Sequence, residues 1–219
     1  MALSPQEKFT KLLEQINYSA PALMKGQVAA VIVHQKSRVW ELTLHFPHLL
    51  PAEVYQGLFQ ALRVSFYQLA QAQVALQITA DEAPLTQDLL VAYWRPLVQQ
   101  TFGQAGMAVE LAEQTEPQLV GQQVQVPLEN EQIKVFMENK FFGPLARAYQ
   151  RVGFPTFTFR GVVDEAKSQA QIDLVKQKQE AQDAALVKKA LAQLQANQAK
   201  QAAAQAAAPQ DGPVVIGKS

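Results

Sequence analysis

The stretch from Val124 to Asp164, VQVPLENEQIKVFMENKFFGPLARAYQRVGFPTFTFRGVVD, predicts a short strand, an amphipathic helix and a second strand. Its two ends alternate apolar with polar or small residues, as half-buried strands do, whereas its middle repeats apolar residues every three or four positions. Asn130 can cap the helix, and Gly153 with Pro155 can end it. The stretch therefore predicts one β-α-β unit.

An earlier stretch, residues 42–81, repeats this order of predicted elements over nearly the same length. A helix begins after Pro51, and residues 73–79 alternate again, as a strand does. The apolar positions of that helix form a stripe wide enough to cover a sheet: Val54, Tyr55, Leu58, Phe59, Leu62, Phe66 and Leu69. The chain therefore contains two copies of one small unit.

Each copy is preceded by a further helix and a further strand. In the first, residues 5–16 predict a helix, and residues 28–34 and 39–46 predict an antiparallel pair of strands. In the second, Thr86 starts a helix, and a hairpin is expected around Gly121. Each unit then has the order α-β-β-α-β.

The predicted fold class is α+β, with domain I over residues 1–82 and domain II over residues 84–164. Two details stay open in the second unit. Residues 107–111 alternate and can form a strand. The long helix can be interrupted at Gly143-Pro144, because proline disfavours a helix interior.

Residues 165–208 contain neither glycine nor proline and consist largely of Ala, Gln, Lys and Glu. This composition predicts a charged helical linker, with too few apolar residues for a long coiled coil. Residues 214–216, Val-Val-Ile, predict the start of another strand. Residues 209–219 are therefore expected to open a further domain that is truncated.

Bulk composition excludes several classes of protein. Lysine plus arginine equals aspartate plus glutamate at 19 each, so the chain has no global basic field for strong nonspecific nucleic-acid binding. Cysteine is absent, which excludes disulfides and zinc-finger frameworks. The N-terminus lacks a signal-sequence pattern, and no apolar run is long enough to span a bilayer. A cytoplasmic protein is predicted.

The three histidines, His34, His45 and His48, are the candidate metal ligands. They are not spaced to share one helical face, and no nearby Asp or Cys completes a ligand set, so structural or surface roles are favoured. The nucleotide-binding, nucleophile-elbow and zinc-protease motifs are absent from the sequence. Neither a metal, a cofactor nor a catalytic residue is predicted.

Five cations of the second unit are the candidate contacts for nucleic acid or a protein partner: Lys134, Lys140, Arg147, Arg151 and Arg160. Phe141, Phe142 and Tyr149 lie among them, and an arginine-aromatic face can contact phosphates and stack bases. The alternative is structural, because cations in the last half of a helix complement its dipole. Residues 84–164 also carry six basic against eight acidic side chains, which disfavours a general basic surface.

The order of elements is close to that of a type-II K-homology (KH) domain, which clamps a nucleic-acid strand with a GxxG loop between two helices. The nearest break in the long helix, Gly143-Pro144, lacks the second glycine. A KH-like topology is therefore predicted without KH binding chemistry.

Several segments, in this order, resemble the N-terminal region of PolC-type DNA polymerase III α subunits, the replicative polymerases of many Gram-positive bacteria. They are FTKLLEQIN, VWELTLHFPHLLPAEVYQGL, DLLVAYWRPLV and NKFFGPLARAYQRVGFPTFTF. The resemblance covers residues 5–165, and the tail leading to PVVIG is similar to the linker before that family's OB domain.

The resemblance implies that the chain belongs to a longer DNA-directed DNA polymerase with 3'-5' exonuclease activity, whose catalytic residues lie outside this stretch. The two units would match two N-terminal domains related to truncated KH folds and to the polymerase-binding domain of the clamp-loader τ subunit. Their implied role is replisome assembly, by binding τ or other replisome proteins, with contact to single-stranded DNA as the alternative. A cytoplasmic, nucleoid-associated location would follow.

Overall fold

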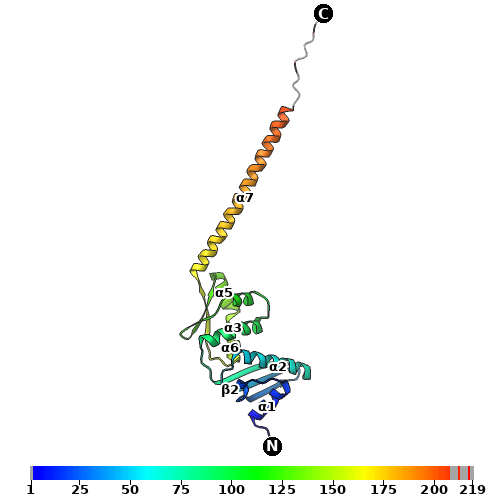
Figure 1. The fold of residues 1–219 in the computed structure, drawn as a ribbon, viewed down its shortest axis with the longest axis vertical. Helices are drawn as coiled ribbons and strands as arrows, with labels where there is room; N and C mark the ends of the chain where they lie inside the picture. Colours follow the sequence, from blue (N-terminus) through cyan, green and yellow to red (C-terminus); the bar gives the residue numbers. More distant parts are fainter. Residues whose placement is uncertain (1, 208–211, 213–216, 218–219) are drawn as a thin grey trace. The chain divides into compact units, whose positions relative to one another are not determined.

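The computed structural model of the chain describes residues 2–207, 212 and 217 (Figure 1). It divides into two units, Met1–Glu165 and Ala166–Ser219. The first unit contains both sheets, and the second contains nearly all of one long helix. The strand predicted at residues 214–216 lies outside the described residues.

The first half of the compact unit has the order α-β-β-α-β. Its elements are α1 (Pro5–Ile16), the 3-10 turn η1 (Pro21–Leu23), β1 (Gln27–His34), β2 (Val39–His48), α2 (Ala52–Ala70) and β3 (Gln73–Glu82). The sheet order is β1-β2-β3, with β1 antiparallel and β3 parallel to β2. A capping box starts α1, because the Glu7 N–H donates to Ser4 Oγ and the Ser4 N–H donates to Glu7 Oε2.

The second half repeats this arrangement with one extra helix and one helix broken in two. Its elements are α3 (Gln87–Phe102), α4 (Met107–Gln114), β4 (Gln118–Val120), β5 (Gln123–Leu128), α5 (Glu131–Lys140), α6 (Phe142–Arg151) and β6 (Thr158–Val163). β4 is antiparallel and β6 parallel to the central strand β5. The α+β class and the two small three-stranded sheets predicted from the sequence are confirmed.

The possible strand at residues 107–111 is wrong, because these residues form α4. A run of five residues is too short for alternation to distinguish a strand from a helix. Packing favours the helix here, because Ala108, Val109 and Ala112 are buried at helical spacing. The Trp94 indole N–H donates to the Ala112 carbonyl, which fixes α4 against α3.

The long helix is interrupted at Phe141, two residues before the expected break at Gly143-Pro144. Pro144 instead lies in the first turn of α6, where its missing N–H has no intrahelical partner to lose. The kink therefore precedes the proline.

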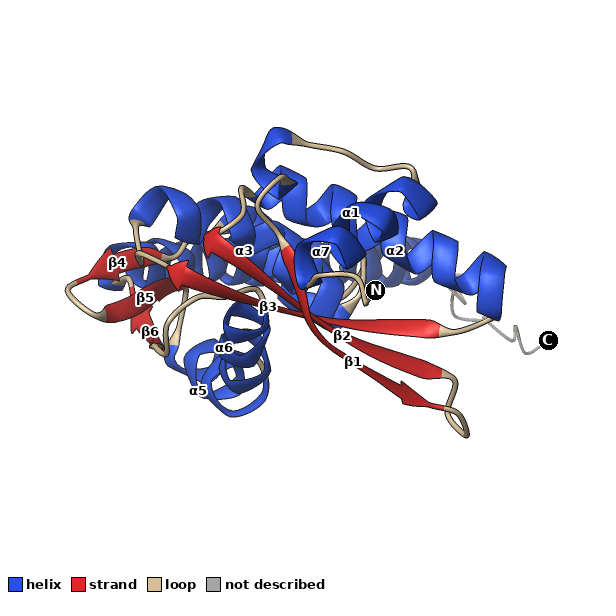
Figure 2. Cartoon of the chain, turned by 90° about the horizontal axis from the view of Figure 1, so that it is seen from below, coloured by secondary structure: helices blue, strands red, loops and turns tan. Residues whose placement is uncertain are grey.

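Each sheet has one apolar face. In the first sheet, Leu42 pairs with Leu76 and Leu44 with Ile78, and all four side chains are buried. α1 and α2 lie on one side of this sheet, whereas α5 and α6 lie on the other side, towards the second sheet (Figure 2). In the second sheet the buried pair is Val124 with Phe159.

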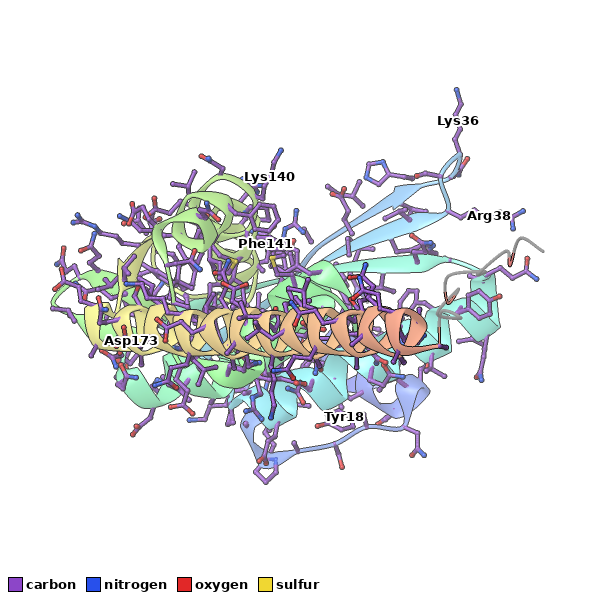
Figure 3. All side chains as sticks on the ribbon, turned by 90° about the horizontal axis from the view of Figure 1, so that it is seen from above. Tyr18, Lys36, Arg38, Lys140, Phe141 and Asp173 are labelled. Atoms are coloured by element: carbon purple, nitrogen blue, oxygen red, sulfur yellow. The ribbon has the colours of Figure 1, made fainter. Side chains whose placement is uncertain are left out.

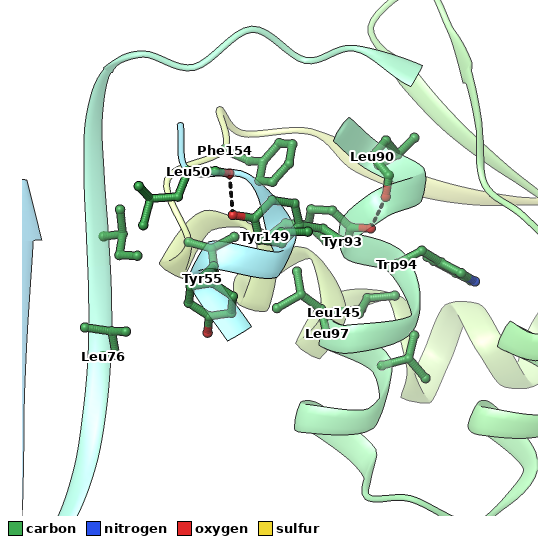
Figure 4. Packing of buried hydrophobic residues seen from close by; sticks show 14 of the residues in the cluster. Leu50, Tyr55, Leu76, Leu90, Tyr93, Trp94, Leu97, Leu145, Tyr149 and Phe154 are labelled. Carbon is green, nitrogen blue, oxygen red and sulfur yellow. Dashed lines mark hydrogen bonds between the residues drawn. The ribbon is translucent and has the colours of Figure 1, made fainter. Parts of the chain in front are cut away.

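The two halves share one hydrophobic core, and three buried tyrosines cross it: Tyr55, Tyr93 and Tyr149. The Tyr93 hydroxyl donates to the Leu50 carbonyl of the first half at 2.7 Å. The Tyr149 hydroxyl donates to the Leu90 carbonyl, also at 2.7 Å (Figure 4). Both buried hydroxyls thus have a main-chain acceptor, as buried polar groups require.

The long helix α7 spans Glu165–Ala206. Its large apolar side chains, Leu186, Val187, Leu191 and Leu194 among them, are exposed. Among the described residues, no helix is both long and apolar enough to cross a membrane.

Candidate functional site

A groove of about 610 Å³ lies beside β3, an edge strand of the first sheet, and is closed on the other side by α6. The first half contributes residues of β2, α2 and β3, and the second half contributes residues of α3 and α6. The groove is therefore built by both halves of the compact unit, which packing of the shared core holds together.

Two arginines of α6, Arg147 and Arg151, line this groove, and both are exposed. They lie four residues apart, so they share one helical face. The opposite face of α6 carries Leu145 and Tyr149, which are buried in the core. Core packing of one face thus presents both guanidinium groups on the other.

Polar side chains of other elements surround the two arginines. Thr43 and Gln77 come from the first sheet, and Gln100 and Thr101 come from α3. Glu41 is the acidic group of this lining, and its carboxylate also lies 3.0 Å from His34 Nε2. The groove therefore combines two cations with side chains that donate and accept hydrogen bonds, which suits an anionic chain carrying its own polar groups.

Tyr55 is a buried residue of the groove lining, and its hydroxyl donates to Gln100 Oε1 at 3.0 Å. Burial raises the pKa of Tyr55, and its hydrogen bond and the nearby positive charge of Arg151 oppose that shift in part. Tyr55 thus stays neutral at physiological pH and holds α2 against α3.

Lys140 is exposed in the last turn of α5, next to Phe141 (Figure 3). It is not among the residues that line the groove. Its position at the α5–α6 junction is nevertheless the one at which a KH fold would carry its GxxG loop.

Lys134 and Arg160 lie on opposite faces of the second sheet. A Cβ at Gly161 would lie 2.7 Å from Lys134 Cγ, so the lysine stem packs across this glycine, and its Nζ lies 3.0 Å from Glu131. Arg160 precedes Gly161 in β6 and is exposed, so its side chain points to the face away from α5. The five cations therefore do not form one continuous face.

The aromatic residues among these cations serve the core. Phe142 and Tyr149 are buried. Phe141 is half-buried and packs edge-on against Phe102 and Phe136, with ring centroids 4.7 Å and 5.1 Å apart. Stacking on nucleic-acid bases would need these rings to leave their contacts.

A GxxG tetrapeptide, Gly103–Gly106, does occur, but it joins α3 to α4 rather than α5 to α6. Both glycines have positive φ, at 92° and 122°. Neither lysine nor arginine occurs between Arg95 and Lys134, so no cation adjoins this tetrapeptide in sequence to hold a phosphate. Reasoning from the β-α-β stretch alone misses this tetrapeptide.

The histidines lie in separate pairs with carboxylates. His34 lies 3.0 Å from Glu41, His45 lies 3.3 Å from Asp81, and His48 lies 3.1 Å from Glu82. Within the described residues, no group of three His, Cys, Asp or Glu side chains could hold a metal ion.

Two family models match the chain. "DNA polymerase III polC-type N-terminus I" matches residues 8–76, and "DNA polymerase III polC-type N-terminus II" matches residues 92–207. The two matches fall on either side of the boundary expected near residue 83. No solved structure gives a significant match.

Curated relatives carry the description "DNA polymerase III PolC-type". The protein of Latilactobacillus sakei is 35% identical over 79% of this chain, and that of Lacticaseibacillus paracasei is 33% identical over the whole chain. The Bacillus subtilis protein is 24% identical over 68% of the chain. The matched regions make up only 11% to 15% of these relatives. The chain therefore belongs to the PolC-type DNA polymerase III family, of which it represents the N-terminal region.

Proposed function

We propose that this region is a non-catalytic interaction module of a PolC-type replicative polymerase. It binds the clamp-loader τ subunit or another replisome protein and so helps to assemble the replisome, in the cytoplasm at the nucleoid. The observation that carries the proposal is the pair Arg147 and Arg151 in a polar groove built by both halves of the fold. Lys140 lies outside that lining.

A protein partner fits this groove better than nucleic acid does. The aromatic rings that line the groove, Tyr55 and Phe59, stack on each other and pack in the core, so base stacking is not available there. Gln77, Gln100 and Thr43 can instead bind main-chain amides of an extended acidic segment. The two arginines would bind its carboxylates bidentately.

We also propose that residues 1–82 and 84–164 are two domains that fold together around their shared core, and that the second is a truncated KH-like fold. The order α4-β4-β5-α5-α6-β6 supports this likeness, because type-II KH domains have the order α-β-β-α-α-β. The first domain, with its similar order, would be the relative of the τ polymerase-binding domain.

The test is a pull-down of purified τ subunit and other replisome proteins by the 219-residue chain, at micromolar concentration. We expect retention of τ or one of its partners by the wild-type chain and loss of retention by the double variant Arg147→Glu/Arg151→Glu. Lys8→Glu/Lys11→Glu is the matched control, because it reverses two exposed charges on α1. If none of these proteins is retained, the proposed function is wrong.

The second candidate function is single-stranded nucleic-acid binding by the KH-like half. Exposed Lys140 at the α5–α6 junction and exposed Arg160 on β6 favour it. It predicts an affinity for single strands that falls steeply with salt and that weakens on charge reversal of these two residues. Salt-independent or absent binding would remove this candidate.

A further inference from the structure

The last turn of α2 leaves an apolar side chain uncovered where the sequence places it in the core. Leu69 lies on the stripe that contains Leu58, Leu62 and Phe66, and the first two of these are fully buried. Leu69 is nevertheless 78% exposed. The apolar stripe of α2 therefore extends beyond the buried core, and its last residue, Leu69, is left uncovered.

A hollow of about 560 Å³ lies between this turn and the β1–β2 hairpin. Val33 and Trp40 from the hairpin and Leu69 from the helix line it, and Trp40 packs edge-on against Phe66 at 5.3 Å. A partner side chain entering here would extend the existing core rather than cover a flat surface.

A second hollow, of about 530 Å³, lies between α2 and the start of β3. Val64 and Tyr67 line it, and Tyr67 is 67% exposed. Gln68 and Ala72 border both hollows, so the two adjoin across the last turn of α2. We call the two hollows together the α2-end surface.

The charged residues that line the two hollows are arginines, and Glu41, which lies outside both linings, is 3.0 Å from His34 of the first hollow. Arg38 lines the first hollow, Arg63 lines the second, and Lys36 projects from the hairpin tip near Arg38 (Figure 3). The sequence contains no Asp or Glu between Glu53 and Asp81. A segment covering the α2-end surface therefore meets cations and no carboxylate from α2 or from the start of β3.

Arg38 occupies a backbone position that favours glycine. Its φ is +53°, in the left-handed region that non-glycine residues rarely adopt. The Arg38 guanidinium donates to Gln71 Oε1 at 3.2 Å, so it is held against the end of α2. The hairpin thus keeps a cation at the rim of the first hollow where glycine would be the less strained residue.

We propose that the α2-end surface is a second docking site, which takes an acidic segment of a partner protein with two bulky apolar side chains. The apolar side chains enter the hollows beside Leu69 and Tyr67, and the carboxylates pair with Arg38 and Arg63. Charge complementarity selects an acidic partner, and aliphatic linings such as Val33, Val64 and Leu69 select a protein rather than nucleic-acid bases. The inference rests on the proposed role as an interaction module. The α2-end surface adjoins the Arg147–Arg151 groove at Val74, but its cations, Arg38 and Arg63, do not line that groove.

The test uses a fluorescein-labelled peptide that carries two Trp or Leu anchors among Asp and Glu residues, titrated with the 219-residue chain in fluorescence anisotropy. We expect saturable binding with a Kd of about 10–100 µM. The variant Leu69→Gln/Arg63→Glu should weaken it at least ~10-fold. Both residues are exposed, so the variant should keep the wild-type urea midpoint.

The matched control is Met24→Gln/Lys25→Glu, which changes an equally exposed apolar residue and its neighbouring cation after η1. It should bind as the wild-type chain does. Arg147→Glu/Arg151→Glu should also leave peptide binding unchanged, which separates this site from the proposed groove. No binding, equal binding by the Leu69→Gln/Arg63→Glu variant, equal binding of a peptide with Lys in place of Asp and Glu, or displacement by single-stranded oligothymidylate would each overturn the proposal.

Discussion

At the scale of single residues, the fold depends on tyrosine hydroxyls that the sequence does not mark as special. Tyr93 and Tyr149 recur at helical spacing with other apolar residues, which indicates a core position but no role for their hydroxyls. In the structure each hydroxyl donates to a main-chain carbonyl, of Leu50 or Leu90, at 2.7 Å. Each therefore fixes the relative position of two elements as well as filling volume.

Replacing Tyr149 by Phe keeps the ring and removes the hydroxyl. The Leu90 carbonyl loses this donor but keeps its helical hydrogen bond within α3, so we expect the free energy of unfolding to fall by about 0.5–1.5 kcal/mol. Urea unfolding followed by circular dichroism measures it. Tyr67→Phe is the control, because Tyr67 is mostly exposed and no loss is expected there. An unchanged urea midpoint for Tyr149→Phe would contradict the role given to its hydroxyl.

Alkaline pH should destabilise the fold through the same residues. Burial raises the pKa of Tyr93 and Tyr149 in the folded state well above the value of about 10 that tyrosine has when unfolded. The folded chain then holds more protons than the unfolded chain above about pH 10, so stability is full below that pH and falls as pH rises. Urea midpoints measured from neutral to alkaline pH should decline only above about pH 10. The tyrosinate absorbance of Tyr93 and Tyr149 should appear only when the chain unfolds. Native-state titration of all tyrosines at their ordinary pKa would refute this.

At the scale of elements, the two halves of the compact unit depend on one another for their packing. The Tyr55 and Tyr93 rings pack with centroids 5.7 Å apart, and each belongs to a different half. A Cβ added to Gly153 of the second half would lie 3.1 Å from Leu49 of the first. The repeat therefore describes the topology, whereas the core spans both copies.

Residues 1–82 expressed alone should lack a cooperative native state. Removing α3 uncovers Leu50 and Tyr55, which are nearly fully buried in the whole chain. We expect a broad urea transition and binding of a hydrophobic dye, against a sharp transition and weak dye binding for residues 1–165. A sharp, dye-free transition for residues 1–82 would instead indicate an independently folded domain.

The sequence predicts the elements better than it predicts the site. Periodicity locates the strands and most helices because each buries one apolar face in a local pattern. The break at Phe141 and the helix α4 depend on contacts with α3. The local pattern of apolar and polar residues does not show such contacts. The groove could not be predicted either, because Thr43, Gln77 and Gln100 face Arg147 only after both halves pack. The exposure of Leu69 could not be predicted for the same reason. Helical spacing predicts the face of α2 on which Leu69 lies, but it does not predict how far the neighbouring β1–β2 hairpin covers that face.

At the scale of the whole molecule, the compact unit Met1–Glu165 carries the core, and α7 adds a helix whose large apolar side chains are exposed. Burial of apolar surface is the main source of stability, so α7 contributes little of it. A chain ending at residue 165 should melt within about 2 °C of the full chain in scanning calorimetry. A markedly lower melting temperature would show that α7 stabilises the compact unit.

Calorimetric titration of purified τ subunit into the 219-residue chain tests the proposed binding of a replisome protein in the groove beside Arg147 and Arg151. We predict saturable binding with a Kd of about 1–10 µM, lost in Arg147→Glu/Arg151→Glu and kept in Lys8→Glu/Lys11→Glu. Binding of τ that both double variants retain equally would contradict the claim, as would the absence of any heat of binding to the wild-type chain.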